Sequence, residues 1–272
     1  MLKIFSLTIK ISIIVVSFLL FSCEKVIDVD LNEADPAIVI EGNLSHADNH
    51  LEVSISKTGS YFGTSEPVKV PGAVVTLEDE SGTRIEAEEK GDGLYGSYQV
   101  YTIPGEEYRL NVEVEGTVYS AVSELNHKPE IDSLGYELYN GSRFLDSGYR
   151  LNVYFSDPAG EENYYRIKIY KNGDIMDRVN DLIVFDDSGI NGKSIEVTLR
   201  GQIFEDGDTA YVEMLSIDEL AWRYFTTFKE AADINPGSPA PANPVTNFNN
   251  GALGYFSAWS HDSGTIIIKK DK

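Results

Sequence analysis

The chain has 272 residues, and its 44 acidic against 22 basic residues give a formal net charge of −22 at pH 7. This excess of carboxylates excludes nucleic acid and anionic membrane surfaces as electrostatic partners. With 1 cysteine the chain cannot close a disulfide within itself, so its stability must come from a hydrophobic core, and its length suffices for one large domain or two modest ones.

Residues 1–22 have the pattern of an export signal. Lys3 and Lys10 supply positive charge, an apolar run follows, and the run ends at the small residue Ser22. The run is shorter than the roughly 20 apolar residues that a transmembrane helix needs. We therefore predict that residues 1–22 are removed and that an acidic tether, residues 23–36, leads into the fold.

The residues before Cys23 indicate how the signal is cleaved. Leu20-Phe21-Ser22-Cys23 resembles the bacterial lipobox, in which the cysteine thiol receives diacylglycerol and becomes the new N-terminus. Acyl chains anchor a domain because each buried CH2 group contributes about 0.8 kcal/mol. The alternative is an unmodified thiol. The acidic tether is similar to the surface-export signals of Bacteroidota lipoproteins. We predict lipidation of Cys23 and an anchor in the outer membrane, on the cell surface rather than the periplasmic face.

Residues 37–125 alternate apolar and polar side chains with the period of two that is typical of half-buried β-strands. The clearest runs are Ile38–Ile40, Leu51–Ile55, Val75–Leu77 and Leu110–Val114. Turn-forming residues, mainly Asp, Gly and Pro, separate these runs. Short strands at this spacing predict a first antiparallel β-sandwich.

A polar linker, residues 126–130, leads to a second strand-rich region, residues 131–272. Its alternating runs predict a second β-sandwich. The expected strands are Leu151–Phe155, Tyr165–Ile169, Ile195–Leu199, Tyr211–Leu215 and, as the last strand, Thr265–Lys269.

One helix, residues 217–232, is expected near the C-terminus. Ser216 and Glu219 have the spacing of a capping box. Apolar residues then recur three and four apart, as on one helix face: Ala221, Tyr224, Phe225, Phe228 and Ala232. Together these patterns predict an all-β protein with two β-sandwich domains in series and one helix packed over an open end of the second sandwich.

Three motifs that can bind cofactors or metals have simpler explanations. Gly91–Gly96 matches G-x-G-x-x-G, but strand-like sequence follows it, which predicts a hairpin turn and no dinucleotide. His46 and His50 lie in a polar loop, where their spacing has no fixed meaning for a metal. The acidic turns 186–192 and 205–208 lack the spacing of a calcium-binding EF-hand loop. We predict no cofactor and no metal.

Catalytic motifs are missing as well. The sequence contains neither G-x-S-x-G nor H-E-x-x-H, and its one cysteine is the predicted lipidation site. The many acidic residues leave open a carboxylate pair of the glycosidase type. We predict that the protein is not an enzyme, with a carboxylate-dependent hydrolase as an alternative.

The segment 243–256 combines amide side chains, glycines and aromatic residues. Where exposed, this combination is typical of binding surfaces. The alternative is a loop that folds back, so that Leu253, Tyr255 and Phe256 cover the core. The predicted partner or ligand surface consists of Asn243, Asn247, Phe248, Asn250, Tyr255 and Phe256.

A series of short motifs, in a fixed order, resembles a known protein family. The motifs are Cys23, Ile38–Gly42, Pro71–Val75, Asp79, Gly82, Gly93, Tyr95, Gly105, Tyr108, Leu110, Tyr119, Ala121, Ile131–Leu134, Asp157-Pro158, Asn163–Arg166, Ser216–Asp218, Asn243-Pro244 and Leu253–Phe256. Together they resemble the Bacteroidota lipoprotein family catalogued as domain of unknown function 4249.

The resemblance implies an outer-membrane lipoprotein that is often encoded beside a TonB-dependent receptor, and it supplies no catalytic residues. The first domain is also similar to prealbumin-like or carboxypeptidase-regulatory-like sandwiches, and the second to immunoglobulin or fibronectin type III folds. The expected function is that of a non-enzymatic accessory or binding subunit of a TonB-dependent transport system, whose partner is the outer-membrane barrel and whose ligand is unknown. The alternative is a stand-alone surface protein for adhesion or envelope structure.

Overall fold

A computed structural model describes residues 36–59, 67–143, 146–232 and 242–270 of the chain. The predicted signal (1–22), Cys23 and nearly all of the predicted tether lie outside these residues. The N-terminal strands are β1 Ile38–Ser45, β2 His50–Lys57, β3 Val68–Lys69, β4 Val74–Glu78, β5 Arg84–Gly91, β6 Leu94–Tyr98, β7 Glu107–Val114 and β8 Thr117–Glu124.

The C-terminal half adds further strands and two helical segments. They are β9 Ile131–Tyr139, β10 Gly148–Ser156, β11 Tyr164–Lys171, β12 Asp174–Ile175, the 3-10 helix η1 Val179–Asp181, β13 Ile183–Asp186, β14 Ser194–Thr198, β15 Thr209–Ile217, the α-helix α2 Glu219–Ala232 and β16 Leu253–Ile267. The prediction of an all-β fold with one helix near the C-terminus is confirmed for the described residues.

Side-chain alternation explains most of these strands. Along β2, for example, Leu51, Val53 and Ile55 are fully buried, whereas the residues between them reach the surface. The apolar row packs into a core and the polar row faces away from it, as a period of two requires. The same rule holds for β7, where every second residue from Tyr108 is buried.

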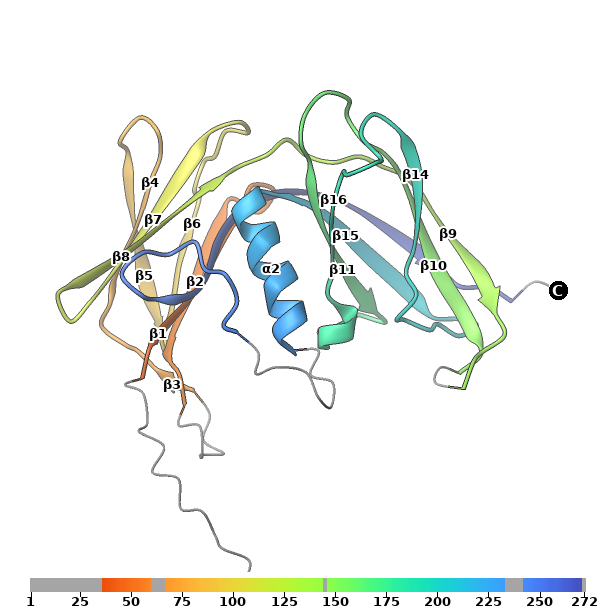
Figure 1. Cartoon of the computed structure of the whole chain (residues 1–272), viewed down its shortest axis with the longest axis horizontal. Helices are drawn as coiled ribbons and strands as arrows, with labels where there is room; N and C mark the ends of the chain where they lie inside the picture. The colour runs from red at the N-terminus through yellow and green to blue at the C-terminus, as the bar shows by residue number, and fades with distance from the viewer. Residues whose placement is uncertain (1–35, 60–66, 144–145, 233–241, 271–272) are drawn as a thin grey trace, which may run out of the picture. The chain divides into compact units, whose positions relative to one another are not determined.

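The strands form two sheets. The larger, 13-stranded sheet has the order β12-β11-β15-β16-β1-β2-β6-β5-β4-β7-β8, with β13 paired to β11 and β3 paired to β2 (Figure 1). The smaller sheet has the order β14-β10-β9. One core lies among β1, β2, β4, β6, β7 and β8, and a second lies among β10, β11, β15 and the partly buried residues of β9 and β14.

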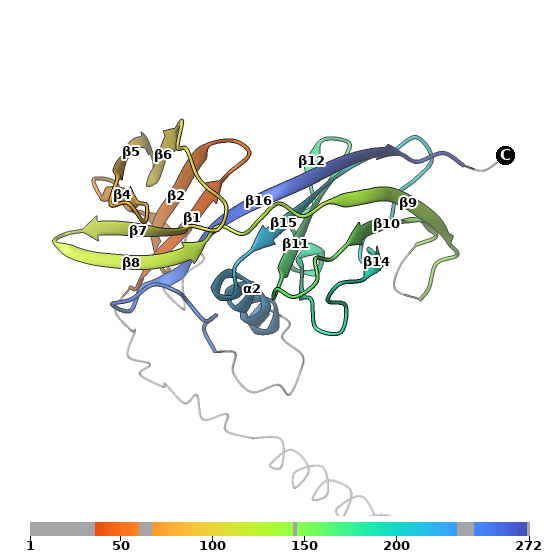
Figure 2. The same ribbon diagram turned by 90° about the horizontal axis from the view of Figure 1, so that it is seen from above.

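Strand β16 joins the two halves of the fold. Its first part pairs in parallel with β1, from Val39↔Leu253 to Ser45↔Trp259. Its second part pairs antiparallel with β15 (Figure 2). Phe256, from β16, therefore lies in the first core. Pro36–Lys272 form one compact unit.

The last strand also begins earlier than the predicted Thr265. Gly254 to Ser260 are buried without interruption, because this part of β16 is covered on both faces. Burial on both faces removes the alternation on which the prediction depended.

Helix α2 begins differently from the capping box that the sequence suggested. Ser216 belongs to β15, and the cap is Asp218, whose Oδ1 accepts a hydrogen bond from the Ala221 N–H at 2.7 Å. Asp218 Oδ2 also accepts one from the Glu124 N–H at 3.1 Å, so this carboxylate links the helix to β8. Inward-facing residues of α2 then pack on residues of β15 and β16, across a sheet face rather than an open end.

Replacing Asp218 by alanine removes both acceptors. We expect the free energy of unfolding to fall by about 2 kcal/mol or more at pH 7, because a helix cap disappears and a buried N–H loses its partner. Burial raises the pKa of Asp218 from 3.8 to about 6. Because the folded state holds the proton of Asp218 more tightly than the unfolded state does, the free energy of unfolding of the wild type falls as the pH rises from 3.8 to about 6. The Asp218→Ala variant lacks this dependence.

Urea unfolding at several pH values measures both effects. The control is Glu219→Ala, since Glu219 forms an exposed ion pair with Arg223 at 2.6 Å. We expect Glu219→Ala to lower the free energy of unfolding by about 0.5 kcal/mol or less. Equal losses in the two variants would contradict the role given to Asp218.

Candidate functional site

Half of the predicted surface residues, Phe248, Tyr255 and Phe256, are buried, which corrects the expectation for these three. Phe248 and Phe256 are buried in the first core. Asn247 donates to the carbonyl oxygens of Val122 and Phe256 and accepts from the Phe256 N–H. Asn250 donates to the Val118 carbonyl at 2.7 Å.

These asparagines hold the segment before β16 against β8 (Figure 2). Their amides satisfy backbone groups on the outer edge of β8, an edge that would otherwise be open to pairing with another chain. The fold-back alternative holds in part, because Phe256 enters the first core, but it does so from strand β16, and Leu253 is only partly buried. Of the predicted surface residues, Asn243 and Asn250 are exposed, and Tyr255 lies in a cleft described below.

The other motifs have structural roles. Gly91–Gly96 forms the expected hairpin turn between β5 and β6. His46 Nδ1 lies 2.7 Å from the Thr102 hydroxyl, and the His50 ring stacks on Tyr98 at 4.3 Å. Within the described ranges, no group of three or more His, Cys, Asp or Glu residues is placed to hold a metal.

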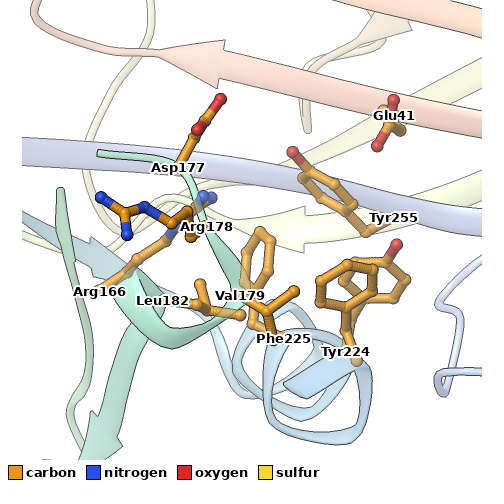
Figure 3. A pocket seen from close by; sticks show the side chains of 10 residues that line it. Glu41, Arg166, Asp177, Arg178, Val179, Leu182, Tyr224, Phe225 and Tyr255 are labelled. Atoms are coloured by element: carbon orange, nitrogen blue, oxygen red, sulfur yellow. The ribbon is translucent and has the colours of Figure 1, made fainter. Parts of the chain in front are cut away.

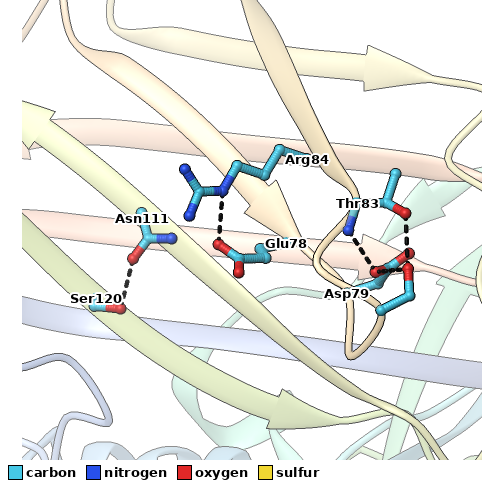
Figure 4. Close-up of polar contacts among 7 residues, drawn as sticks. Glu78, Asp79, Thr83, Arg84, Asn111 and Ser120 are labelled. Carbon is cyan, nitrogen blue, oxygen red and sulfur yellow. Dashed lines mark hydrogen bonds and ion pairs between the residues drawn. The ribbon is translucent and has the colours of Figure 1, made fainter.

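The acidic turns form internal contacts. In the second, Asp208 forms an ion pair with Lys171 at 2.9 Å. In the turn between β4 and β5, a hydrogen bond from the Ser81 hydroxyl lowers the pKa of Asp79, which also accepts one from the Thr83 N–H (Figure 4). Contacts of this kind are typical of Asp residues in ordinary turns.

One cleft lies where α2 and η1 meet β1, β11 and β16. It has a volume of about 220 Å³, and Figure 3 shows the side chains that line it. The lining combines four charged residues with aromatic and aliphatic ones: Glu41, Arg166, Asp177, Arg178, Val179, Leu182, Tyr224, Phe225, Phe228 and Tyr255.

Arg166 is the most unusual of these residues. Its guanidinium carbon lies 4.1 Å from the centre of the Phe225 ring, which is a cation–π contact. Its Nε atom is buried and has no hydrogen-bond partner. Among the described residues no carboxylate lies within ion-pair distance of Arg166, whereas the neighbouring Arg178 pairs with Asp181 at 3.6 Å.

Lys168 lies on the same row of β11 and has a similar environment. Its Nζ lies 4.6 Å from the centre of the Trp259 ring. Burial, together with the nearby Arg166, lowers the pKa of Lys168 to about 8. Arg166 and Lys168 of the polar row of β11 are therefore partly buried against aromatic rings.

Aromatic rings form one wall of the cleft. The Tyr255 ring centre lies 4.8 Å from that of Tyr224 and 4.7 Å from that of Phe225. Burial raises the pKa of both tyrosines, so both hydroxyls are neutral near pH 7. Tyr255 donates to Asn43 Oδ1 at 3.2 Å. The wall is thus apolar, with neutral hydroxyl groups at its edge.

No sequence pattern marked Arg166, Arg178 or Glu41 as a site residue. Arg166 occupies the polar row of an alternating strand, a position that normally faces solvent. The signal that could have found it is the helical stripe of α2, because Tyr224 and Phe225 must cover some sheet face. The motif Asn163–Arg166 contributed to the family resemblance, but it assigned no role to the arginine.

Comparisons with known proteins identify the family and give no function. No curated protein matches the sequence. A two-domain fibronectin type III segment of chicken tenascin is similar at 12% identity, covering 86% of this chain and 100% of that one, with a TM-score of 0.25. The FN1–FN3 domains of chicken CNTN1 are similar at 11% identity, covering 86% and 67%, with a TM-score of 0.24.

The match that covers most of the chain is to a family model. It spans residues 24–265, which includes every described strand apart from the last residues of β16. The chain belongs to the family described as domain of unknown function (DUF4249).

Proposed function

We propose that the protein is a non-enzymatic binding lipoprotein of the outer membrane, anchored through Cys23, that acts as an accessory subunit of a TonB-dependent transport system. The source would be a member of the Bacteroidota, and the folded part would lie on the cell surface. The anchor would keep the folded part beside the barrel.

The observation that carries the binding role is the cleft around Arg166. A binding site needs an apolar wall and a few polar groups directed into a concavity. The aromatic residues of α2 and β16 supply the wall, and Arg166 supplies an unpaired charge. No described helix is both long and apolar enough to span a membrane. The proposed attachment therefore rests on the lipobox, Leu20-Phe21-Ser22-Cys23.

Purification of the tagged full chain from native outer membranes, in mild detergent, tests this proposal. We expect a TonB-dependent barrel, identified by mass spectrometry, to be recovered in near-equal amount. The matched control is Cys23→Ala, which removes the predicted acylation site. We expect this variant to leave the membrane fraction and to recover no barrel. The N-terminal peptide of the wild type should carry the added mass of the acyl chains.

Two results would count against the proposal. Unmodified Cys23 in the membrane-bound protein would remove the anchor. A lipidated protein recovered alone, from cells whose nutrient uptake is normal when the protein is deleted, would favour the stand-alone adhesion or envelope role.

A further inference from the structure

Arg166 is held in the cleft without a carboxylate partner, although acidic residues are twice as numerous as basic ones in this chain. A partly buried cation usually finds an ion pair or a full set of hydrogen bonds, because leaving it unsatisfied costs free energy. Here the Nε atom is buried and unpartnered. The sequence could supply a carboxylate readily, so its absence around Arg166 suggests that an anion from outside completes the site.

The contacts of Arg166 fix its position. The guanidinium lies against the ring of Phe225. A hydrogen bond between Arg166 and Tyr255 partly offsets the rise that burial causes in the pKa of Tyr255. Arg178 lines the same cleft but is already paired with Asp181. A planar, preoriented guanidinium is suited to bind a carboxylate through two parallel hydrogen bonds.

The rest of the cleft limits the kind of molecule that can carry the anionic group. Tyr224, Phe225 and Tyr255 present ring surfaces, and Phe228 adds a ring that is 38% exposed. A dry cavity of about 150 Å³ is known to admit benzene. The cleft, at about 220 Å³, therefore has room for one ring with a short acidic chain. Figure 3 shows Arg166 on one side of the tyrosine rings and Glu41 on the other.

We propose that this cleft binds a small organic acid, with its carboxylate on Arg166 and a flat apolar body against Tyr224, Phe225 and Tyr255. Glu41 and Asp177 are exposed and remain solvated. They disfavour a second negative charge on the ligand, so the class is a monoanion with an aromatic or similarly flat body. The inference rests on the binding role proposed above, but it does not depend on the barrel.

Saturation-transfer NMR on the purified full chain tests the assignment with three probes. They are 3-phenylpropionate, which has both ring and carboxylate, acetate, which has only the carboxylate, and 2-phenylethanol, which has only the ring. We expect 3-phenylpropionate to bind about tenfold or more tighter than either of the others, because both halves of the cleft are then used. Equal affinity for 3-phenylpropionate and acetate, or no saturable binding of 3-phenylpropionate, would overturn the proposal.

Variants separate charge from ring contacts. Arg166→Gln should weaken 3-phenylpropionate by about tenfold or more and leave 2-phenylethanol unaffected, because only the charge-assisted bonds are lost. Phe228→Ala, at an exposed position, should weaken the binding of both ring-bearing probes while lowering the thermal midpoint by no more than about 4 °C. Glu41→Gln removes the repulsion between Glu41 and the carboxylate of the probe, so 3-phenylpropionate should bind slightly more tightly. Weaker binding in Glu41→Gln would contradict an anionic ligand.

Arg109→Gln is the control for loss of an arginine, because Arg109 lies on β7 in an exposed pair with Glu107 at 3.9 Å. It should leave all three affinities unchanged. If Arg166→Gln proves unfolded, Phe228→Ala and Glu41→Gln still decide the question. These titrations contain no barrel, so their failure leaves the purification result standing, and a failed purification leaves the titrations interpretable.

Discussion

Gly254→Ala is expected to destabilise the protein by at least about 4 kcal/mol, at the extreme of what single substitutions do. Gly254 lies in β16 with φ of +95°, opposite Ile40 of β1. A Cβ atom added there would overlap the carbonyl oxygen of Ile40, which belongs to the backbone and cannot rotate away. The parallel β1–β16 ladder would have to separate.

Gly251→Ala is the matched control. Gly251 also has a positive φ, +79°, but a Cβ atom there meets nothing within 4 Å. Only the conformational cost remains, about 1–2 kcal/mol for an L-residue in the left-handed region. Urea unfolding followed by circular dichroism measures both variants. Losses of the same size would mean that the contact with Ile40 is not the cause.

Phe256→Ala is expected to cost about 3–5 kcal/mol, the usual range for truncating a buried phenylalanine. Phe256 is fully buried in the first core, although β16 also completes the sheet of the second half. Both halves should therefore unfold in one transition. Circular dichroism follows the β-sheet as a whole, and fluorescence follows Trp222 and Trp259 near α2. The two signals should shift together.

The control for Phe256→Ala is Phe228→Ala. Phe228 is 38% exposed on α2, so its truncation should cost less than about 1 kcal/mol. Separate transitions for the two signals in Phe256→Ala would show that the halves are independent domains, as the sequence suggested, and that β16 does not couple them.

Most individual strands could be predicted because one face of each is buried. Leu51, Val53 and Ile55 show the rule, since the buried row and the polar row can be read directly from the sequence. The rule fails for the first part of β16, which is buried on both faces. It also fails to show that β16 pairs with β1, because pairing between strands far apart in sequence leaves no local pattern.

The cleft was less accessible to prediction than the strands. Alternation places Arg166 in the polar row of β11, but it does not say whether water or α2 covers that row. The amide-rich segment, residues 243–256, was predicted to be an exposed surface because its side chains are polar. Asn247 and Asn250 are polar, yet their partners are backbone groups of β8 and of their own segment, which composition does not reveal.

The pairing of Val39 with Leu253 has a consequence for how the protein is made. Synthesis delivers β1 first and β16 last, and contacts between such distant segments form slowly because a long loop must close. Until β16 is available, β1 has one neighbour and an open edge, a state that exposes it to aggregation. Folding of the first half is therefore expected to wait until β16 has reached the same compartment as β1, and a chaperone that shields β1 would act during that interval.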